Sequence, residues 1–140
     1  MVRRKKGKPL ALLIDSNISP SILSVATHIR PLLKEIGDVK VAKIVMLQKY
    51  SLENSKKLSK EGFTPIIVHG DLDIHFALEA MELVYNEKID ILALVTENEK
   101  FIPLICRARE LGKEVVLLLS SNPQNQGLQK SADLVLPIDL

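Results

Sequence analysis

Short apolar runs alternate with amphipathic segments along the whole chain. Six runs rich in Val, Ile and Leu predict β-strands at residues 10–14, 39–47, 63–68, 91–95, 115–119 and 134–138. They contain few polar residues, which is typical of parallel strands that are covered on both faces. The segments between them carry apolar residues every three or four positions and predict helices. We therefore expect an α/β fold, a three-layer α/β/α sandwich with a mostly parallel sheet and right-handed crossovers.

Three apolar stripes mark expected helices. The first comprises Ile18, Ile22, Val25, Ile29, Leu32 and Ile36, the second Ile74, Ala77, Leu78, Met81 and Val84, and the third Phe101, Leu104, Ile105, Ala108 and Leu111. Beside the second stripe, His75, Glu79 and Glu82 are expected to face solvent. Pro31 lies inside the first stripe, so we expect that helix to kink or restart there.

Residues that favour helix ends support these boundaries. Ser19 is suited to an N-cap and Pro20 to the first helical position, where its missing N–H costs nothing. Gly37, Gly62 and Gly112 each follow a helical stripe, where a left-handed C-cap is expected.

Composition narrows the class of protein. A length of 140 residues suits one domain, and 46% apolar and 26% charged residues exclude a wholly disordered or collagen-like chain. No apolar run approaches the roughly 18 residues that span a bilayer, and the basic start lacks the apolar segment of a secretory leader. The single cysteine, Cys106, can form neither an internal disulfide nor, alone, a zinc site. We expect a cytoplasmic protein without a membrane segment.

The net charge of +2 conceals an asymmetry between the start of the chain and the rest. Five basic residues and no acidic ones occur at the start, at Arg3, Arg4, Lys5, Lys6 and Lys8, and the remainder has 14 basic and 17 acidic residues. We therefore divide the chain into a flexible basic tail, residues 1–8, and a single domain, residues 9–140. The tail can attract phosphate backbones, or it can be a solvated terminus without a ligand.

Acidic and amide residues follow four of the expected strands, at residues 15–17, 69–73, 96–100 and 120–122. Ligands of an open parallel sheet bind beyond the carboxyl ends of its strands, so these segments form the candidate site. Oxygen-rich side chains of this kind suit hard divalent cations such as Mg²⁺ or Mn²⁺.

Other kinds of site lack their residues. Neither a Gly-x-Gly-x-x-Gly fingerprint nor a phosphate-binding loop follows the first strand, and His69 stands where a response-regulator receiver has its phosphoacceptor Asp. Cys106 has no evident His partner, so we do not expect a cysteine nucleophile. The string His69-x-Asp71-x-Asp73-x-His75 could bind a metal independently, but Asp71 or Asp73 as a helix N-cap is the simpler explanation.

The candidate segments occur in a specific order along the chain. The set includes residues 12–17, the segment 70–83 that begins Gly-Asp-Leu-Asp, residues 94–96, and Ser131-Ala132-Asp133 near the end, together with residues 38–43 and 62–67. Taken together over about residues 10–138, they resemble the NYN domains of the PIN-like ribonuclease group, especially an archaeal subgroup. Each motif is weak by itself. The resemblance implies a PIN-like, Rossmann-like α/β/α sandwich.

The resemblance also implies an acidic pocket that holds Mg²⁺ or Mn²⁺ and acts on RNA. By position, Asp15 and Asp73 match the metal-binding acids, and Asn17 matches an amide that orients Asp15 or the phosphate. The basic tail would then help to capture the RNA backbone through Arg3, Arg4, Lys5 and Lys6.

The chain departs from the family pattern after the fourth strand. The family usually carries Asp-x-Asp-Phe there, whereas Asn98 and Lys100 occupy the two acidic positions before Phe101. Asn98 could still offer an oxygen to a metal, so Asp15, Asp73 and Asn98 are the candidate catalytic residues. Lys100 cannot ligate in its charged form.

Three interpretations of this departure stay open. In the first, Lys100 pairs with one of the two aspartates and substitutes for the metal, which leaves a folded but inactive site. In the second, Glu97 and Glu99 replace the lost acids, although Thr96 and Glu99 could instead form a capping box for the next helix. In the third, a partner chain completes the site.

The expected function is that of an RNA-associated protein of the metal-dependent ribonuclease group with a degraded site and weak or no hydrolysis. The alternative is a non-catalytic module that keeps the nuclease fold and binds RNA or protein. A homodimer is plausible for a domain of this size. Two Tyr, three Phe and no Trp offer few stacking platforms, so sequence-specific reading of single-stranded RNA is not supported.

Overall fold

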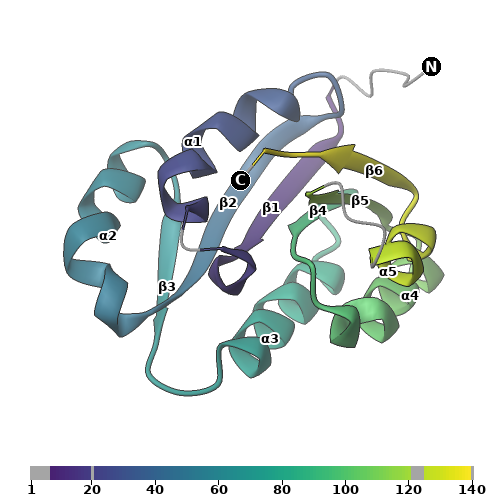
Figure 1. Ribbon diagram of the computed structural model, residues 1–140. Coiled ribbons are helices and arrows are strands. Elements are labelled where there is room, and N and C mark those ends of the chain that lie inside the picture. The colour runs from purple at the N-terminus through teal and green to yellow at the C-terminus, as the bar shows by residue number, and fades with distance from the viewer. Residues whose placement is uncertain (1–6, 20, 121–124, 140) are drawn as a thin grey trace.

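The computed structural model describes residues 7–19, 21–120 and 125–139 (Figure 1). Its strands are β1 (Pro9–Asp15), β2 (Asp38–Leu47), β3 (Thr64–Val68), β4 (Ile91–Val95), β5 (Glu114–Leu119) and β6 (Leu134–Pro137). Its helices are α1 (Ile22–Leu32), α2 (Ser51–Lys60), α3 (Leu72–Val84), α4 (Ile102–Glu110) and α5 (Gln126–Ser131), with short 3₁₀ turns η1 (Ser16–Ile18), η2 (Gln48–Tyr50) and η3 (Glu99–Phe101). All six predicted strands are present, each within one residue at either end.

The six strands form one sheet in the order β3-β2-β1-β4-β5-β6, and every neighbouring pair is parallel. Central strands β1 and β4 are apolar except for Asp15 at the end of β1, and all their residues except Pro9 are buried. Burial on both faces explains the unbroken apolar runs of the sequence. The predicted α/β sandwich is confirmed.

The sheet separates two apolar cores. One lies under α1 and α2 and includes Ile22 and Leu58, and the other lies under α3, α4 and α5 and includes Phe76 and Leu128 (Figure 1). Connections after β1 and β2 therefore cross one face, and connections after β3, β4 and β5 cross the other. The direction of winding changes between β1 and β4, and a crevice at the carboxyl ends of such strands is where open α/β sheets bind ligands.

Helix α3 buries a different face from the one that the sequence predicts. Its buried residues are Leu72, Phe76, Ala80, Leu83 and Val84. Ile74 is 57% exposed and Leu78 is 62% exposed, so the prediction that they face the core is wrong. The helix is apolar on two sides, and periodicity alone could not rank them. The ring of Phe76, which packs 4.6 Å from the ring of Phe101, occupies the inner side.

Three predicted helix-end features also differ from the structure. Helix α1 ends one residue after Pro31, and no second helix begins before β2 among the described residues. It begins at Ile22, so the predicted start is two residues early. The Ser19 hydroxyl accepts a hydrogen bond from the Ser21 N–H at 3.3 Å. Pro20 lies outside the described residues. Gly37 has no positive φ, unlike Gly62 and Gly112.

Gly37 is needed for close approach and not for a left-handed cap. A Cβ at this position would lie 2.9 Å from both the Lys8 carbonyl oxygen and the Ile91 Cδ1. The absence of a side chain lets the turn before β2 pass against the neighbouring strands.

In the part of the chain that the structure describes, no helix is long and apolar enough to cross a membrane.

Candidate functional site

Asp15 lies at the centre of the carboxyl edge of the sheet, as the last residue of β1. It is only 2% exposed. Its Oδ2 accepts a hydrogen bond from the Thr96 hydroxyl at 2.8 Å, and its Oδ1 accepts from the Asn17 backbone N–H at 2.9 Å. Asp15 thereby caps η1, and its carboxylate has partners on both oxygens.

Burial raises the pKa of the Asp15 carboxyl above its ordinary value, because a charge is disfavoured away from water. The hydrogen bonds from Thr96 and Asn17 oppose this rise, and the nearby charge of Asp73 adds to it. An anion at Asp15 is therefore held at a cost that a cation in the pocket would relieve.

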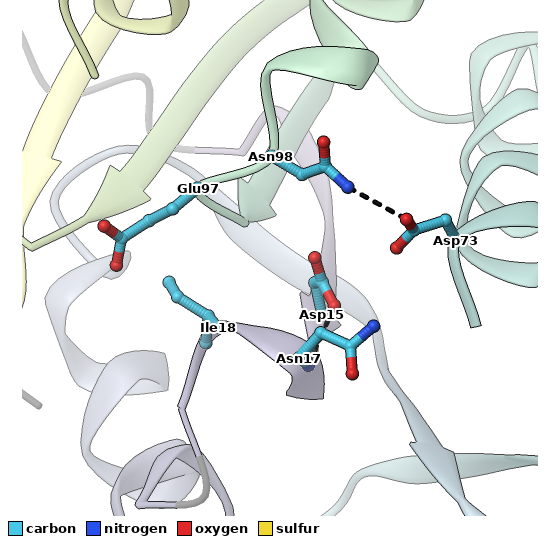
Figure 2. A pocket seen from close by; sticks show the side chains of 6 residues that line it. All are labelled: Asp15, Asn17, Ile18, Asp73, Glu97 and Asn98. Carbon is cyan, nitrogen blue, oxygen red and sulfur yellow. Dashed lines mark hydrogen bonds between the residues drawn. The ribbon is translucent and has the colours of Figure 1, made fainter. Parts of the chain in front are cut away.

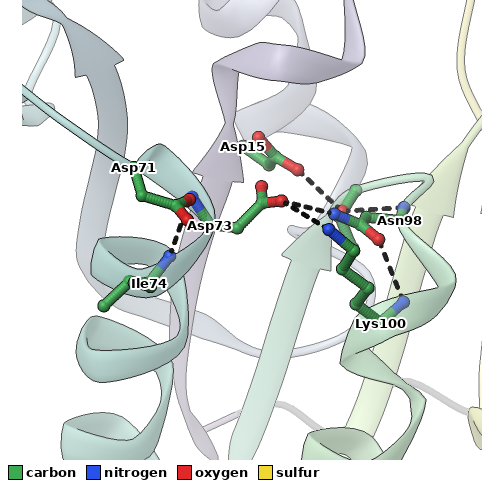
Figure 3. A network of polar contacts seen from close by, with 7 residues as sticks. Asp15, Asp71, Asp73, Ile74, Asn98 and Lys100 are labelled. Atoms are coloured by element: carbon green, nitrogen blue, oxygen red, sulfur yellow. Dashed lines mark hydrogen bonds and ion pairs between the residues drawn. The ribbon is translucent and has the colours of Figure 1, made fainter.

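Asp73 faces Asp15 from the first turn of α3, which Asp71 caps. The Asp71 Oδ1 accepts from the backbone N–H of Asp73 at 2.9 Å and from that of Ile74 at 3.4 Å (Figure 3). The prediction that Asp71 is a helix N-cap is thus confirmed. Among the described residues, no group of three or more His, Cys, Asp and Glu side chains is arranged to hold a metal, so the His69–His75 string forms no such site.

The two oxygens of Asp73 have different surroundings. Its Oδ2 accepts from the Asn98 side-chain Nδ2 at 3.1 Å and lies 3.8 Å from the Lys100 Nζ (Figure 3). Its Oδ1 is buried and has no hydrogen-bond partner in the described part of the chain. A buried carboxylate oxygen without a partner is costly, and a cation or a water on the pocket side would satisfy it.

Asn98 forms the cap of η3 and has a fixed orientation. Its Oδ1 accepts from the Lys100 backbone N–H at 2.9 Å, while its Nδ2 donates to Asp73. Both contacts require this assignment of the amide, because an N–H needs an acceptor and a carboxylate needs a donor. The Asn98 carbonyl oxygen is therefore engaged with the backbone, and the NH₂ group is what reaches Asp73.

The predicted capping box of Thr96 and Glu99 does not form. The Thr96 hydroxyl accepts from the Asn98 N–H at 3.2 Å and donates to Asp15, and Glu99 is exposed. Asn98 takes the capping role because η3 begins at Glu99. Thr96 instead connects the ends of β1 and β4 through its hydrogen bond to Asp15. The sequence did not predict this contact.

Lys100 lies at the edge of the site and not within it. Its side chain is 79% exposed, and its 3.8 Å approach to Asp73 is a long ion pair. Such a surface pair is worth little free energy. The ammonium nevertheless contributes positive charge beside the carboxylate that a metal would need.

Glu97 occupies the opposite side of the pocket from Asp73 (Figure 2). Its carboxylate accepts from the Ser120 hydroxyl at 2.9 Å and from the Asn125 Nδ2 at 2.9 Å. Sequence reasoning named Glu97 but missed Asn125, which is 6% exposed. These partners come together because β4 and β5 are neighbours in the sheet, and nothing in the local sequence indicates it.

A pocket of about 250 Å³ joins these groups, and it is lined by Asp15, Asn17, Ile18, Asp73, Glu97 and Asn98 (Figure 2). Four of the predicted site residues, Asp15, Asn17, Asp73 and Asn98, thus share one pocket. Arg3, Arg4, Lys5 and Lys6 lie outside the described residues. The unpartnered Asp73 oxygen beside a buried Asp15 fits a hydrated Mg²⁺ or Mn²⁺, which commonly binds through one or two carboxylates and keeps several waters.

The sequence matches the NYN domain family over residues 9–139, nearly the whole chain. The chain belongs to the NYN domain family. It therefore falls within the PIN-like nuclease group, as the ordered motifs predicted.

Two proteins illustrate the relationships of this NYN chain. It is 35% identical over 142 residues to an uncharacterized protein of Methanocaldococcus jannaschii, and the alignment covers 97% of this chain and 58% of the relative. The NYN chain thus spans little more than half the length of that curated relative. A crystal structure of a protein of unknown function from Vibrio parahaemolyticus has a TM-score of 0.78 at 20% identity, covering 99% of this chain and 97% of that one. At this identity the likeness shows a shared fold.

Proposed function

We propose that the protein is an RNA-associated member of the PIN-like nuclease group whose catalytic site is degraded, so that phosphodiester hydrolysis is weak or absent. One observation carries the proposal. The Asn98 amide and the Lys100 ammonium approach the same oxygen of Asp73 at 3.1 and 3.8 Å, from the two positions where the family pattern has acids. Donors thus replace ligands around the carboxylate that a metal would use.

The presence of Asn98 and Lys100 in place of two acids changes the charge of the pocket as well as its geometry. A divalent cation between Asp15 and Asp73 would supply an activated water and stabilise the phosphoryl transition state. Two further carboxylates would attract that cation, whereas the ammonium of Lys100 repels it and the Asn98 amide contributes no charge. Asn98 could present its oxygen only by turning its amide, which would break its contacts with both Asp73 and the Lys100 N–H.

The roles of the remaining residues follow from their positions. Asp15 and Asp73 would hold any Mg²⁺ or Mn²⁺ that binds. Asn17 lines the pocket with an exposed side chain and can orient a phosphate. We assign capture of the RNA backbone to the basic tail, through Arg3, Arg4, Lys5 and Lys6, because the rest of the chain carries more acidic than basic residues. A cytoplasmic location suits the single cysteine.

Cleavage of labelled RNA tests the proposal. Single-stranded and structured RNAs are incubated with and without Mn²⁺ and with four proteins: the natural chain, Asp15→Asn, the double variant Asn98→Asp with Lys100→Asp, and that double variant carrying Asp15→Asn as well. We expect the natural chain to cleave little or no RNA. The double variant should gain Mn²⁺-dependent cleavage, and the added Asp15→Asn should abolish the gain.

Two results would change the conclusion. Strong Mn²⁺-dependent cleavage by the natural chain, lost in Asp15→Asn, would show an intact site, and Glu97 would then be the next residue to substitute. RNA binding without cleavage by any variant would favour the alternative, a non-catalytic binding module that keeps the nuclease fold.

A further inference from the structure

A second pocket adjoins the acidic one on the other side of η1. Its volume is about 190 Å³, and it is lined by Ser16, Asn17, Leu23, Leu47, Lys49 and Tyr50. Asn17 lines both pockets. The two cavities therefore meet at this side chain.

The sheet order places the two pockets side by side along one edge. Strands β4, β1 and β2 are consecutive neighbours. The acidic pocket lies at the ends of β4 and β1, and the second pocket lies at the ends of β1 and β2, where η2 continues directly from Leu47. A polymer lying across this edge would pass from one pocket to the next.

The second pocket differs from the first in charge. Its lining residues include a cation, Lys49, and no carboxylate. The first pocket is lined by Asp15, Asp73 and Glu97. A phosphate is repelled by the first pocket when no metal is bound there and is attracted by the second.

The second pocket also offers apolar and aromatic surface. Leu23 is 8% exposed and belongs to the core under α1, and the half-buried Tyr50 packs against that core. The Lys49 Nζ lies 5.1 Å from the centre of the Tyr50 ring, which is within the range of a cation–π contact. A cation beside an apolar surface with an aromatic edge suits a nucleotide, whose phosphate is charged and whose base is flat and apolar on its faces.

We propose that this second pocket binds one nucleotide of a single-stranded RNA that lies along the carboxyl edge of the sheet. The Lys49 ammonium pairs with the phosphate, and the Tyr50 ring with the side chains of Leu23 and Leu47 contacts the base. Asn17 lies between this nucleotide and the acidic pocket. The inference rests on the proposed association with RNA and adds the place at which the strand is held, beside the end of β2.

Binding of a short labelled oligouridine, measured by fluorescence anisotropy in EDTA over a range of salt concentrations, tests this assignment. The proteins are the natural chain, Lys49→Gln, Tyr50→Leu and the control Lys56→Gln, which removes the same charge from an exposed position on α2. Thermal melts confirm that each variant is folded.

Each variant has a distinct expected result. Lys49→Gln should weaken binding roughly threefold to tenfold and lower the magnitude of the log–log salt slope by about 0.7, the value for one phosphate contact on a single strand. Tyr50→Leu should weaken binding by about fivefold or more, and this loss should persist at high salt because contact between the ring and the base is not screened. Lys56→Gln should leave both the affinity and the slope near those of the natural chain.

The outcomes separate this inference from the proposed function. If the natural chain binds the RNA and both Lys49→Gln and Tyr50→Leu match Lys56→Gln, the second pocket is not a nucleotide site, while the association with RNA stands. If the natural chain binds no RNA even at low salt, both the proposed function and this inference fail.

Discussion

Asp15 and Asp73 are the two facing carboxylates of the acidic pocket, and the protein holds them in different ways. Asp15 ends a central strand, is 2% exposed and has hydrogen-bond partners on both oxygens. The Asp73 side chain is 26% exposed, shares one oxygen between Asn98 and Lys100, and leaves the other oxygen without a partner among the described residues.

The difference separates a fixed group from an adjustable one. Asp15 is tied to Thr96, so its place is set by the pairing of β1 with β4. The environment of Asp73 depends on two side chains of the segment after β4, and these are the positions that depart from the family pattern. The capacity of the pocket for a cation is therefore decided at Asp73, while its architecture is decided at Asp15.

The largest expected effect comes from restoring acids beside Asp73. The double variant Asn98→Asp with Lys100→Asp should melt at a lower temperature than the natural chain without metal, because four carboxylates then repel one another. Mn²⁺ should raise its stability by about 2.7 kcal/mol at one hundred times the dissociation constant, since only the folded state binds.

The natural chain is the control for this experiment and should show little or no shift with Mn²⁺. A clear rise in its Tm would contradict our account of Asn98 and Lys100. Melting Lys100→Ala with Mn²⁺ separates the two effects of the double variant, because this single variant removes the ammonium without adding a metal ligand.

Removing the hydroxyl that holds Asp15 should cost less but still be substantial. Thr96→Val keeps the shape of a fully buried side chain but leaves Asp15 Oδ2 and the Asn98 N–H without this partner. We expect a loss of about 2 kcal/mol in the free energy of unfolding, measured by urea denaturation. Thr64→Val, at an exposed position on the edge strand β3, is the matched control and should change stability by less than about 0.5 kcal/mol. Equal effects at the two sites would mean that the Asp15–Thr96 bond is not important for stability.

Neutralising Asp15 should stabilise the protein. The pKa of the Asp15 carboxyl is higher in the folded chain than in the unfolded chain, so protonated Asp15 favours folding. This contribution is lost as the pH rises from the pKa of the unfolded chain through the pKa of the folded chain. Asp15→Asn should therefore melt at a higher temperature than the natural chain at pH 7. The advantage should shrink as pH falls toward 4. An advantage that grows at low pH would have the wrong sign for a raised pKa.

The smallest effect is expected for the ion pair at Lys100. Lys100→Ala should change stability by less than about 0.5 kcal/mol, because the pair is long and its lysine is mostly exposed. Lys43→Ala provides the comparison, since the Lys43–Glu79 pair is 3.0 Å long and both side chains are about one-fifth exposed. Thermal melts should rank Lys43→Ala as the more destabilising. The reverse order would show that Lys100 is a structural part of the site.

Strands β1, β4 and β5 were predictable because their residues are almost all apolar and buried on both faces. The outer strands β3 and β6 are less buried but are short apolar runs, and all six strands were found within one residue. The buried face of a helix was harder to predict. The α3 sequence carries apolar residues on two sides, and the choice of Phe76 over Ile74 depended on which residue could pack against Phe101.

The sequence by itself determined the sheet, the order of motifs and the carboxyl-edge position of Asp15, Asn17, Asp73 and Asn98, because each follows from local pattern and from the geometry of parallel strands. The contacts among these residues were decided by the tertiary structure. Asp15 meets Thr96 across a separation of 81 residues, and Asp73 meets Asn98 across 25. Which amide atom of Asn98 faces Asp73, and which oxygen of Asp73 is left without a partner, depend on the packing of η3 against α3, since hydrogen bonds form between groups that the fold brings within reach.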